Sequence, residues 1–161
     1  MAAPLRLIRL RDCAEEPWRN GAGRTRTLWS GQDARISVAA LDRAAPFSAF
    51  AGVDRTFCLL GPDRVTLIVD GAERKLAPGD WTSFAGEAAA AVRLEGGAVQ
   101  ALNVMTTRGT AQHAVQRAAG PADAAMLVAL AGDGAWYEAG DLLLPPYPAA
   151  LAGSFLAVRI Y

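Results

Sequence analysis

The sequence predicts an all-β protein built as a sandwich or a barrel. Short strand-like segments recur along the chain, with turn signals containing Gly or Pro every ~8–12 residues. Of the 161 residues, 52% are hydrophobic and only 20% are charged, so the chain can bury a substantial core. No segment shows a convincing amphipathic helical stripe.

The clearest strand signal is ARISVAAL at residues 34–41. Its alternation places Arg35 and Ser37 on one face of a strand, with Ile36 and Val38 on the other. We expect two more strands where apolar runs follow, at residues 55–60 and 64–69.

Three glycine-containing turns are predicted to connect neighbouring strands. Asp70-Gly71 is the residue pair typical of a two-residue hairpin. Gly96-Gly97 links two apolar runs in the same way, and residues 132–134 lead into a further strand at 135–139. Residues 110–119 are expected to form a linker with a turn or two of helix, because their helix propensity is good but no stripe supports it.

A Gly-Asp pair occurs twice in similar surroundings, at Gly79-Asp80 and at Gly140-Asp141. Each pair follows a predicted strand and precedes an apolar one. The repetition predicts two β units of similar plan, joined by residues 106–122 into a tandem or fused double barrel. Coincidence is the alternative, because Gly-Asp is a common turn pair.

Composition excludes several classes of partner. Sixteen basic and sixteen acidic residues cancel, so no overall field attracts nucleic acid or an anionic membrane. Arginines interrupt the N-terminal segment where a secretory signal would be apolar, and we expect a cytoplasmic protein. Cys13 and Cys58 lack C-x-x-C spacing and are expected to be two buried, unpaired thiols.

The common catalytic and cofactor motifs are absent. The chain has a single histidine, His113, too few for an ordinary cupin metal cage, so we expect neither metal nor cofactor and a solvated His113. No Gly-x-Ser-x-Gly elbow occurs. The Gly21-x-Gly23 pair lacks the third glycine of a dinucleotide fingerprint, and no Walker lysine follows it.

What remains is a polar set with aromatic neighbours. Arginine can bind a carboxylate through two parallel charge-assisted hydrogen bonds. Two such contacts could hold a small diacid with a binding free energy of ~4–8 kcal/mol. Taken singly, each of these residues could instead have an ordinary structural role, on a solvated strand face, in a turn pair or in core packing. The polar members are Asn20, Thr25, Arg26, Arg35, Ser37, Ser48, Asp54, Arg55, Asn103 and Arg108, with Trp18, Phe47, Phe50 and Phe84 as aromatic walls.

Four ordered motifs carry a family resemblance. They are PWRNGAGRTR with ARISVA, PFSAFAGVDR, FAGE and LNVMTTRG, and they run from Pro17 to about Gly109. In order and spacing they resemble the HutD/Ves family of bacterial cupin-like proteins. The resemblance implies a metal-free bicupin with a double-stranded β-helix (jelly-roll) fold. It implies one compact unit over residues 1–161, with a first barrel over about 1–105 and linker and second-barrel strands over 106–161.

The resemblance also implies a function. The family's proposed role is to restrain histidine catabolism by binding a small carboxylate such as formylglutamate, formiminoglutamate or urocanate. Carried over by position, the ligand-binding residues are Trp18, Asn20, Thr25, Arg26, Arg35, Ser37, Phe47, Ser48, Asp54, Arg55, Asn103 and Met105. The motif loop, residues 17–29, would bring its backbone close to the ligand, and its tryptophans would exclude water.

Two other functions stay open. One is a metal-independent isomerase, lyase or hydrolase with Asp54 as general base. The other is an interaction module with a vestigial pocket, and the sequence also leaves a homodimer open. Departures from the family pattern bear on ligand identity more than on fold; they are Ala22, Thr27, Ala34, Ala51, Ala101, Leu102 and Thr107.

Overall fold

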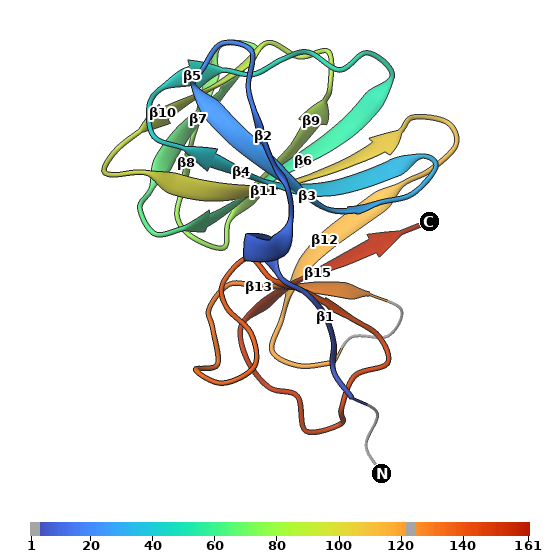
Figure 1. Cartoon of the computed structure of the whole chain (residues 1–161). Helices are drawn as coiled ribbons and strands as arrows, with labels where there is room; N and C mark the ends of the chain where they lie inside the picture. The colour runs from blue at the N-terminus through green and yellow to red at the C-terminus, as the bar shows by residue number, and fades with distance from the viewer. Residues whose placement is uncertain (1–3, 122–124) are drawn as a thin grey trace.

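The computed structural model describes residues 4–121 and 125–161, and folds them into three antiparallel β-sheets (Figure 1). We name these the upper, central and lower sheets. The central sheet, in the order β2-β3-β4-β11-β6-β9, consists of β2 (Glu15–Pro17), β3 (Gly23–Ser30), β4 (Ala34–Leu41), β6 (Val53–Gly61), β9 (Trp81–Ala85) and β11 (Val99–Thr107). The all-β prediction is confirmed.

The other two sheets pack on opposite faces of the central one. The upper sheet, in the order β5-β10-β7-β8, consists of β5 (Ala45–Pro46), β7 (Val65–Val69), β8 (Ala72–Leu76) and β10 (Ala90–Leu94). The lower sheet, in the order β1-β14-β13-β15-β12, consists of β1 (Arg6–Ile8), β12 (His113–Ala118), β13 (Met126–Ala129), β14 (Leu142–Leu144) and β15 (Phe155–Ile160). A short 3-10 turn, η1 (Leu10–Asp12), follows β1.

The central sheet is buried on both faces because its apolar residues point both ways. Phe57 and Leu59 pack with the upper sheet, while Ile36, Cys58 and Leu102 pack with the lower sheet. Successive strand residues point to opposite faces, so a strand covered on both sides needs an almost unbroken apolar run. This explains the composition of β4, β6 and β11.

The predicted turns have different outcomes. Asp70-Gly71 joins β7 to β8 as a hairpin, with φ of 48° and 82° at its two residues, as a tight hairpin turn requires. Gly96-Gly97 does join two strands, but the hairpin prediction is wrong, because β10 belongs to the upper sheet and β11 to the central sheet. The strand expected at 135–139 is also wrong. The carboxylate of Asp133 accepts the backbone N–H groups of residues 135–137 and holds them in a loop.

The linker expected at 110–119 is instead largely an edge strand. Strand β12 pairs along its whole length with β15, so tertiary pairing outweighs local helix propensity. His113 lies at the start of β12 and is not solvated as predicted. Its Nε2 and Nδ1 lie 2.7 and 2.8 Å from the hydroxyls of Thr56 and Thr106 on the central sheet. Burial lowers the pKa of His113 below its ordinary value.

The two Gly-Asp pairs form turns with the same hydrogen bonds. Gly79 and Gly140 have φ of 90° and 89°, a conformation that glycine adopts without strain. Asp80 accepts the N–H of the residue three before it at 2.9 Å, and so does Asp141. Strands β9 and β14 follow directly. The repeated sequence pattern thus corresponds to a repeated local structure.

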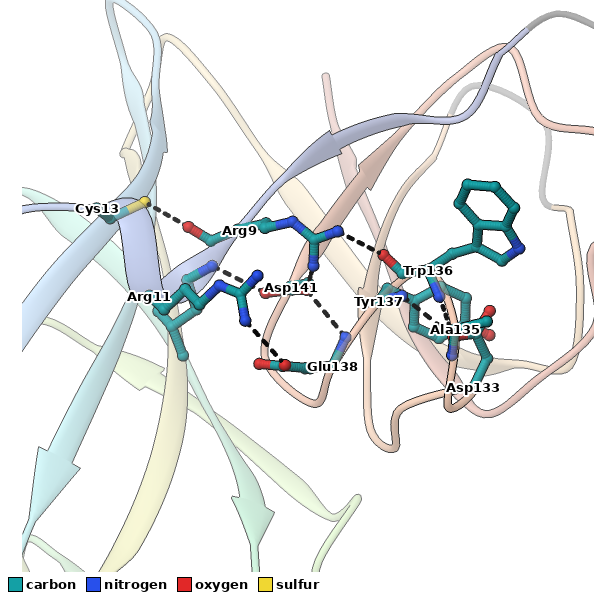
Figure 2. A network of polar contacts seen from close by, with 10 residues as sticks. Arg9, Arg11, Cys13, Asp133, Ala135, Trp136, Tyr137, Glu138 and Asp141 are labelled. Carbon is teal, nitrogen blue, oxygen red and sulfur yellow. Dashed lines mark hydrogen bonds and ion pairs between the residues drawn. The ribbon is translucent and has the colours of Figure 1, made fainter.

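The N-terminal segment is anchored to the second of these turns (Figure 2). The buried Asp141 carboxylate accepts the backbone N–H of Leu10 at 2.8 Å and lies 3.7 Å from the guanidinium of Arg9. Strand β1 pairs with β14. Residues 6–8 therefore lie in the lower sheet, although the predicted boundary near residue 105 assigns them to the first barrel.

Neither cysteine forms a disulfide. Cys58 is fully buried in the core between the central and lower sheets, and burial raises the pKa of its thiol. Cys13 is only partly buried, so the expectation of two buried thiols is met at one position. Across residues 4–121 and 125–161, no helix has the length and apolar character needed to cross a membrane.

Candidate functional site

A cavity of about 340 Å³ lies over the central sheet, on the face turned toward the upper sheet. Its volume is within the range of small-molecule sites, ~300–1,000 Å³. Strands β3, β4, β6 and β11 form its floor, and the turn after β2 and the loop after β5 form its walls. The lining residues are Glu16, Pro17, Trp18, Arg19, Asn20, Thr25, Arg35, Ser37, Phe47, Ser48, Phe50, Arg55, Asn103 and Met105.

Strand register brings the polar floor together from distant parts of the chain. Met105 on β11 pairs with Arg35 on β4 and with Arg55 on β6. Two positions earlier, Asn103 pairs with Ser37 on β4. Residues two apart on a strand share a face, so all five side chains lie on the same side of the sheet.

Arg55 is the central feature of this floor. Only 4% of the residue is exposed, and its Nε and Nη2 donate hydrogen bonds to Oδ1 of Asn103 at 3.0 and 2.8 Å. Its Cζ lies 4.8, 5.4 and 5.7 Å from the ring centroids of Phe47, Phe84 and Phe50. Three aromatic rings and an amide thus hold the guanidinium in place.

No acidic side chain of the described residues forms an ion pair with Arg55. Desolvation therefore lowers the pKa of Arg55 to about 10, which still leaves the guanidinium charged at neutral pH. A buried cation without a counter-ion is costly in water-free surroundings. An anion bound in the cavity would offset that cost.

Arg35 is the second guanidinium on the floor. Its Nε donates to the hydroxyl of Thr27 at 3.2 Å, and within the described part of the chain it too has no acidic partner. Arg19 at the cavity wall likewise forms no ion pair there. Glu16 is the single carboxylate among the lining residues, so the cavity has an excess of positive charge.

The turn between β2 and β3 shapes the aromatic wall. The indole Nε1 of Trp18 donates to Oγ1 of Thr25 at 2.8 Å, and the ring meets Phe47 edge-on at 5.8 Å. Asn20 accepts the backbone N–H of Ala22 at 3.0 Å and so stabilises the turn. This tryptophan covers one side of the cavity.

The structure brings together all but two of the twelve predicted ligand-binding residues. Arg26 points away from the cavity, where it donates to the backbone oxygens of Arg11 and Cys13 and pairs with Glu15 at 3.1 Å. Asp54 is also outside, because it precedes Arg55 on β6 and therefore faces the opposite way. Its carboxylate pairs with Arg108 at 2.9 Å.

Trp29 does not line the cavity, although both tryptophans of the motif loop were expected to exclude water from the ligand. The register of β3 against β4 shifts between Thr27 and Trp29, and a bulge of this kind turns later side chains to the other face. Trp29 therefore packs against the core between the central and lower sheets, and of the two tryptophans in the loop only Trp18 lines the cavity.

Sequence reasoning missed two charged lining residues, Glu16 and Arg19. Both flank the Pro17-Trp18 pair, so proximity to the motif was the available signal. Residues 4–121 and 125–161 contain no cluster of three His, Cys, Asp or Glu side chains that could hold a metal.

Comparison with known proteins decides the family. The model of the HutD family matches residues 10–138 of this chain, which include every residue that lines the cavity. The chain belongs to the HutD family.

Two solved structures share the fold of this HutD-family protein. HutD from Pseudomonas fluorescens SBW25 superimposes with a TM-score of 0.82 over 98% of both chains, at 22% identity. An RmlC-like cupin from Shewanella frigidimarina matches with a TM-score of 0.52 at 10% identity, covering 62% of this chain and 88% of its own. These matches confirm the prediction of a cupin-like all-β fold.

A sequence relative comes from Pseudomonas putida. It is described as an uncharacterized 21.2 kDa protein in the hutC 3' region, and it is 37% identical over 109 residues. The match covers 63% of this HutD-family chain and 57% of the relative, so the chain spans little more than half the length of that protein.

Proposed function

We propose that this protein binds a small carboxylate in the Arg55 cavity and thereby restrains histidine catabolism. The observation that carries the proposal is the buried Arg55 guanidinium, which faces the cavity without an acidic partner among the described residues. Membership of the HutD family and the hutC-region relative support histidine-pathway intermediates as ligands. Formylglutamate, formiminoglutamate and urocanate are the candidates.

The geometry favours binding over the two alternatives. The enzyme hypothesis needs Asp54 beside the ligand, whereas Asp54 pairs with Arg108 outside the cavity. The interaction-module hypothesis needs arginines turned to solvent, whereas Arg55 is buried. An anion in the cavity could accept hydrogen bonds from the other N–H groups of Arg55, since a guanidinium has five N–H donors and only two of these donate to Asn103.

The test is a thermal-unfolding screen with the three candidates, acetate and an uncharged amide analogue. A ligand at about 100 times its Kd adds about 2.7 kcal/mol, or roughly 5–10 °C in Tm for a chain of this size. Arg55→Gln should remove the shift. The control is Arg93→Gln, which breaks an exposed ion pair with Glu73 and leaves the cavity intact.

Two results would contradict the proposal. The first is the absence of a shift for every carboxylate tested on the unmodified protein. The second is a shift that survives in Arg55→Gln, because the binding site would then lie elsewhere. Isothermal titration of the ligand with the largest shift gives Kd and stoichiometry for the same three proteins.

A further inference from the structure

The loop between β5 and β6, residues 47–52, forms one wall of the cavity. We call it the Phe50 loop, because Phe50 lines the cavity with its ring centroid 5.7 Å from Cζ of Arg55. Phe47 and Ser48 of the same loop also line the cavity. The position of this loop therefore determines how closely an aromatic wall approaches the buried cation.

Three charged side chains meet beside the Phe50 loop, and none of the three is among the residues that line the cavity. Strand β6 lies between β9 and β11 and is antiparallel to both, so its start adjoins the ends of the other two. Asp54 is at the start of β6, Glu87 follows β9 and Arg108 follows β11. We name these three residues the Arg108 cluster. Each comes from a different sequence motif, namely PFSAFAGVDR, FAGE and LNVMTTRG.

Arg108 joins both carboxylates of the cluster. Its Nε donates to Asp54 at 2.9 Å, and its Nη1 and Nη2 donate to the two carboxylate oxygens of Glu87, each at 3.1 Å. Nη2 also donates to the carbonyl oxygen of Val53 at 3.0 Å. The contact with Glu87 is a bidentate pair, which fixes orientation as well as distance. Hydrogen bonds from Arg108 and from the backbone of Gly52 lower the pKa of Glu87 to about 2, so the cluster is ionised at neutral pH.

The backbone of the Phe50 loop is held by this cluster and its neighbour in the FAGE motif. Glu87 accepts the N–H of Gly52 at 2.6 Å, and the carbonyl oxygen of Gly52 accepts the N–H of Arg108 at 2.8 Å. The carbonyl oxygen of Gly86 accepts the N–H of Phe50 at 2.7 Å. A Cβ at position 86 would collide with the carbonyl oxygen of Phe50, so this close approach requires glycine.

The alternative is an exposed ion-pair network without influence on the cavity. The three side chains are 43–48% exposed, and isolated surface ion pairs contribute little to stability. The exposed Arg93–Glu73 pair is an example, since it joins one side chain to another. The Arg108 cluster also binds loop backbone, so its loss should displace the Phe50 loop more than it lowers global stability.

We propose that the residues of the Arg108 cluster are positioning residues, which hold the Phe50 loop against Arg55 and thereby set the affinity of the cavity for its ligand. This rests on the carboxylate-binding function proposed above. It concerns how the cavity wall is held, and not which carboxylate binds. Asp54 thus acts on the site from outside the cavity.

The direction of the change in Kd separates positioning from long-range electrostatics. Arg108→Gln removes a positive charge and Glu87→Gln removes a negative one, so a field effect alone would weaken anion binding in the first variant and strengthen it in the second. Loss of the loop contacts weakens binding in both. We expect the Kd of formylglutamate, measured by isothermal titration, to rise about tenfold in each variant. The control Arg93→Gln, with the same charge change as Arg108→Gln, should stay within about twofold.

Two further variants make the test specific to the loop. Arg108→Lys keeps the charge but loses the bidentate contact, and it remains informative if Arg108→Gln does not fold; its Kd should also rise. Phe50→Ala should raise the Kd as well. Adding Arg108→Gln to Phe50→Ala should change the Kd by less than about twofold, because the cluster acts through this loop.

Hydrogen exchange tests the loop contacts without a ligand. The amides of Phe50 and Gly52 should exchange at least about tenfold faster in Arg108→Gln, while the amides of β15 exchange as in the unmodified protein. Opposite changes in Kd for Arg108→Gln and Glu87→Gln, or an unchanged Kd or loop exchange in Arg108→Gln, would overturn the positioning role and leave carboxylate binding intact. Absence of carboxylate binding by the unmodified protein would overturn both proposals.

Discussion

Arg55 and Asn103 are diagonal neighbours on adjacent strands, and both hydrogen bonds between them end on the same amide oxygen. An amide orients a guanidinium as a carboxylate would, but it supplies no negative charge. The pair therefore keeps Arg55 fixed, charged and free to receive an anion, in a site with three phenylalanine rings around the cation. Preorganisation of this kind reduces the ordering cost of binding.

Asn103→Asp tests this arrangement by adding the missing charge. The new carboxylate should pair with Arg55 inside the protein and compete with the ligand. We expect the carboxylate-induced rise in Tm to disappear while the free protein melts at the same temperature or higher, both measured by thermal unfolding. An undiminished ligand response in Asn103→Asp would contradict the role assigned to the amide.

Replacing the whole pair by apolar residues should stabilise the free protein. Buried ionic groups are often neutral or unfavourable relative to well-packed hydrophobic residues of similar volume. We therefore expect Arg55→Met with Asn103→Leu to raise the free energy of unfolding by about 1–3 kcal/mol in urea titrations. The same double variant should no longer respond to carboxylates. A less stable double variant would show that the pair stabilises the fold in the absence of ligand.

His113 should make stability depend on pH near neutrality. Its pKa in the folded protein is lower than in the unfolded chain, so the unfolded chain binds more protons below pH 6.5. Stability is thus fully present above this pH and is lost as pH falls through the folded pKa, by at most about 1.4 kcal/mol per pH unit. Asp54 opposes the shift, and Thr56 and Thr106 are neutral partners.

Urea unfolding at pH 7.5 and pH 5.5 measures this effect. Because His113 is the single histidine of the chain, His113→Gln removes the imidazole titration completely. The unmodified protein should lose more stability between the two pH values than the variant does. Equal losses in the two proteins would show that the folded and unfolded states titrate alike at this position.

The two Gly-Asp turns offer a matched comparison of stability. Asp141 is 2% exposed and accepts two backbone N–H groups, one of them from the distant Leu10. Asp80 accepts one backbone N–H group, and its side chain is 45% exposed. We expect Asp141→Ala to lower the free energy of unfolding by about 2–4 kcal/mol, and Asp80→Ala to lower it by about 1 kcal/mol. Urea unfolding of both variants checks the difference, and equal costs would contradict it.

Much of the architecture follows from local sequence patterns. Short-period alternation identified β4, and the Asp70-Gly71 pair identified a hairpin, because both signals depend on the geometry of a few consecutive residues. The repeated Gly-Asp pair likewise marks two turns with equal hydrogen bonds. In contrast, β12 lies in a segment of good helix propensity, and it is a strand because β15 pairs with it.

The sequence alone determined which strand neighbours share a face, but not which face would enclose the cavity. Alternation separates Thr25 from Arg26 and Asp54 from Arg55, so within each pair only one side chain could reach a common site. The choice came from tertiary structure, because the central sheet is covered on both sides. Packing of the upper sheet leaves space above Arg55, whereas packing of the lower sheet fills the opposite face with apolar side chains and the His113 contacts.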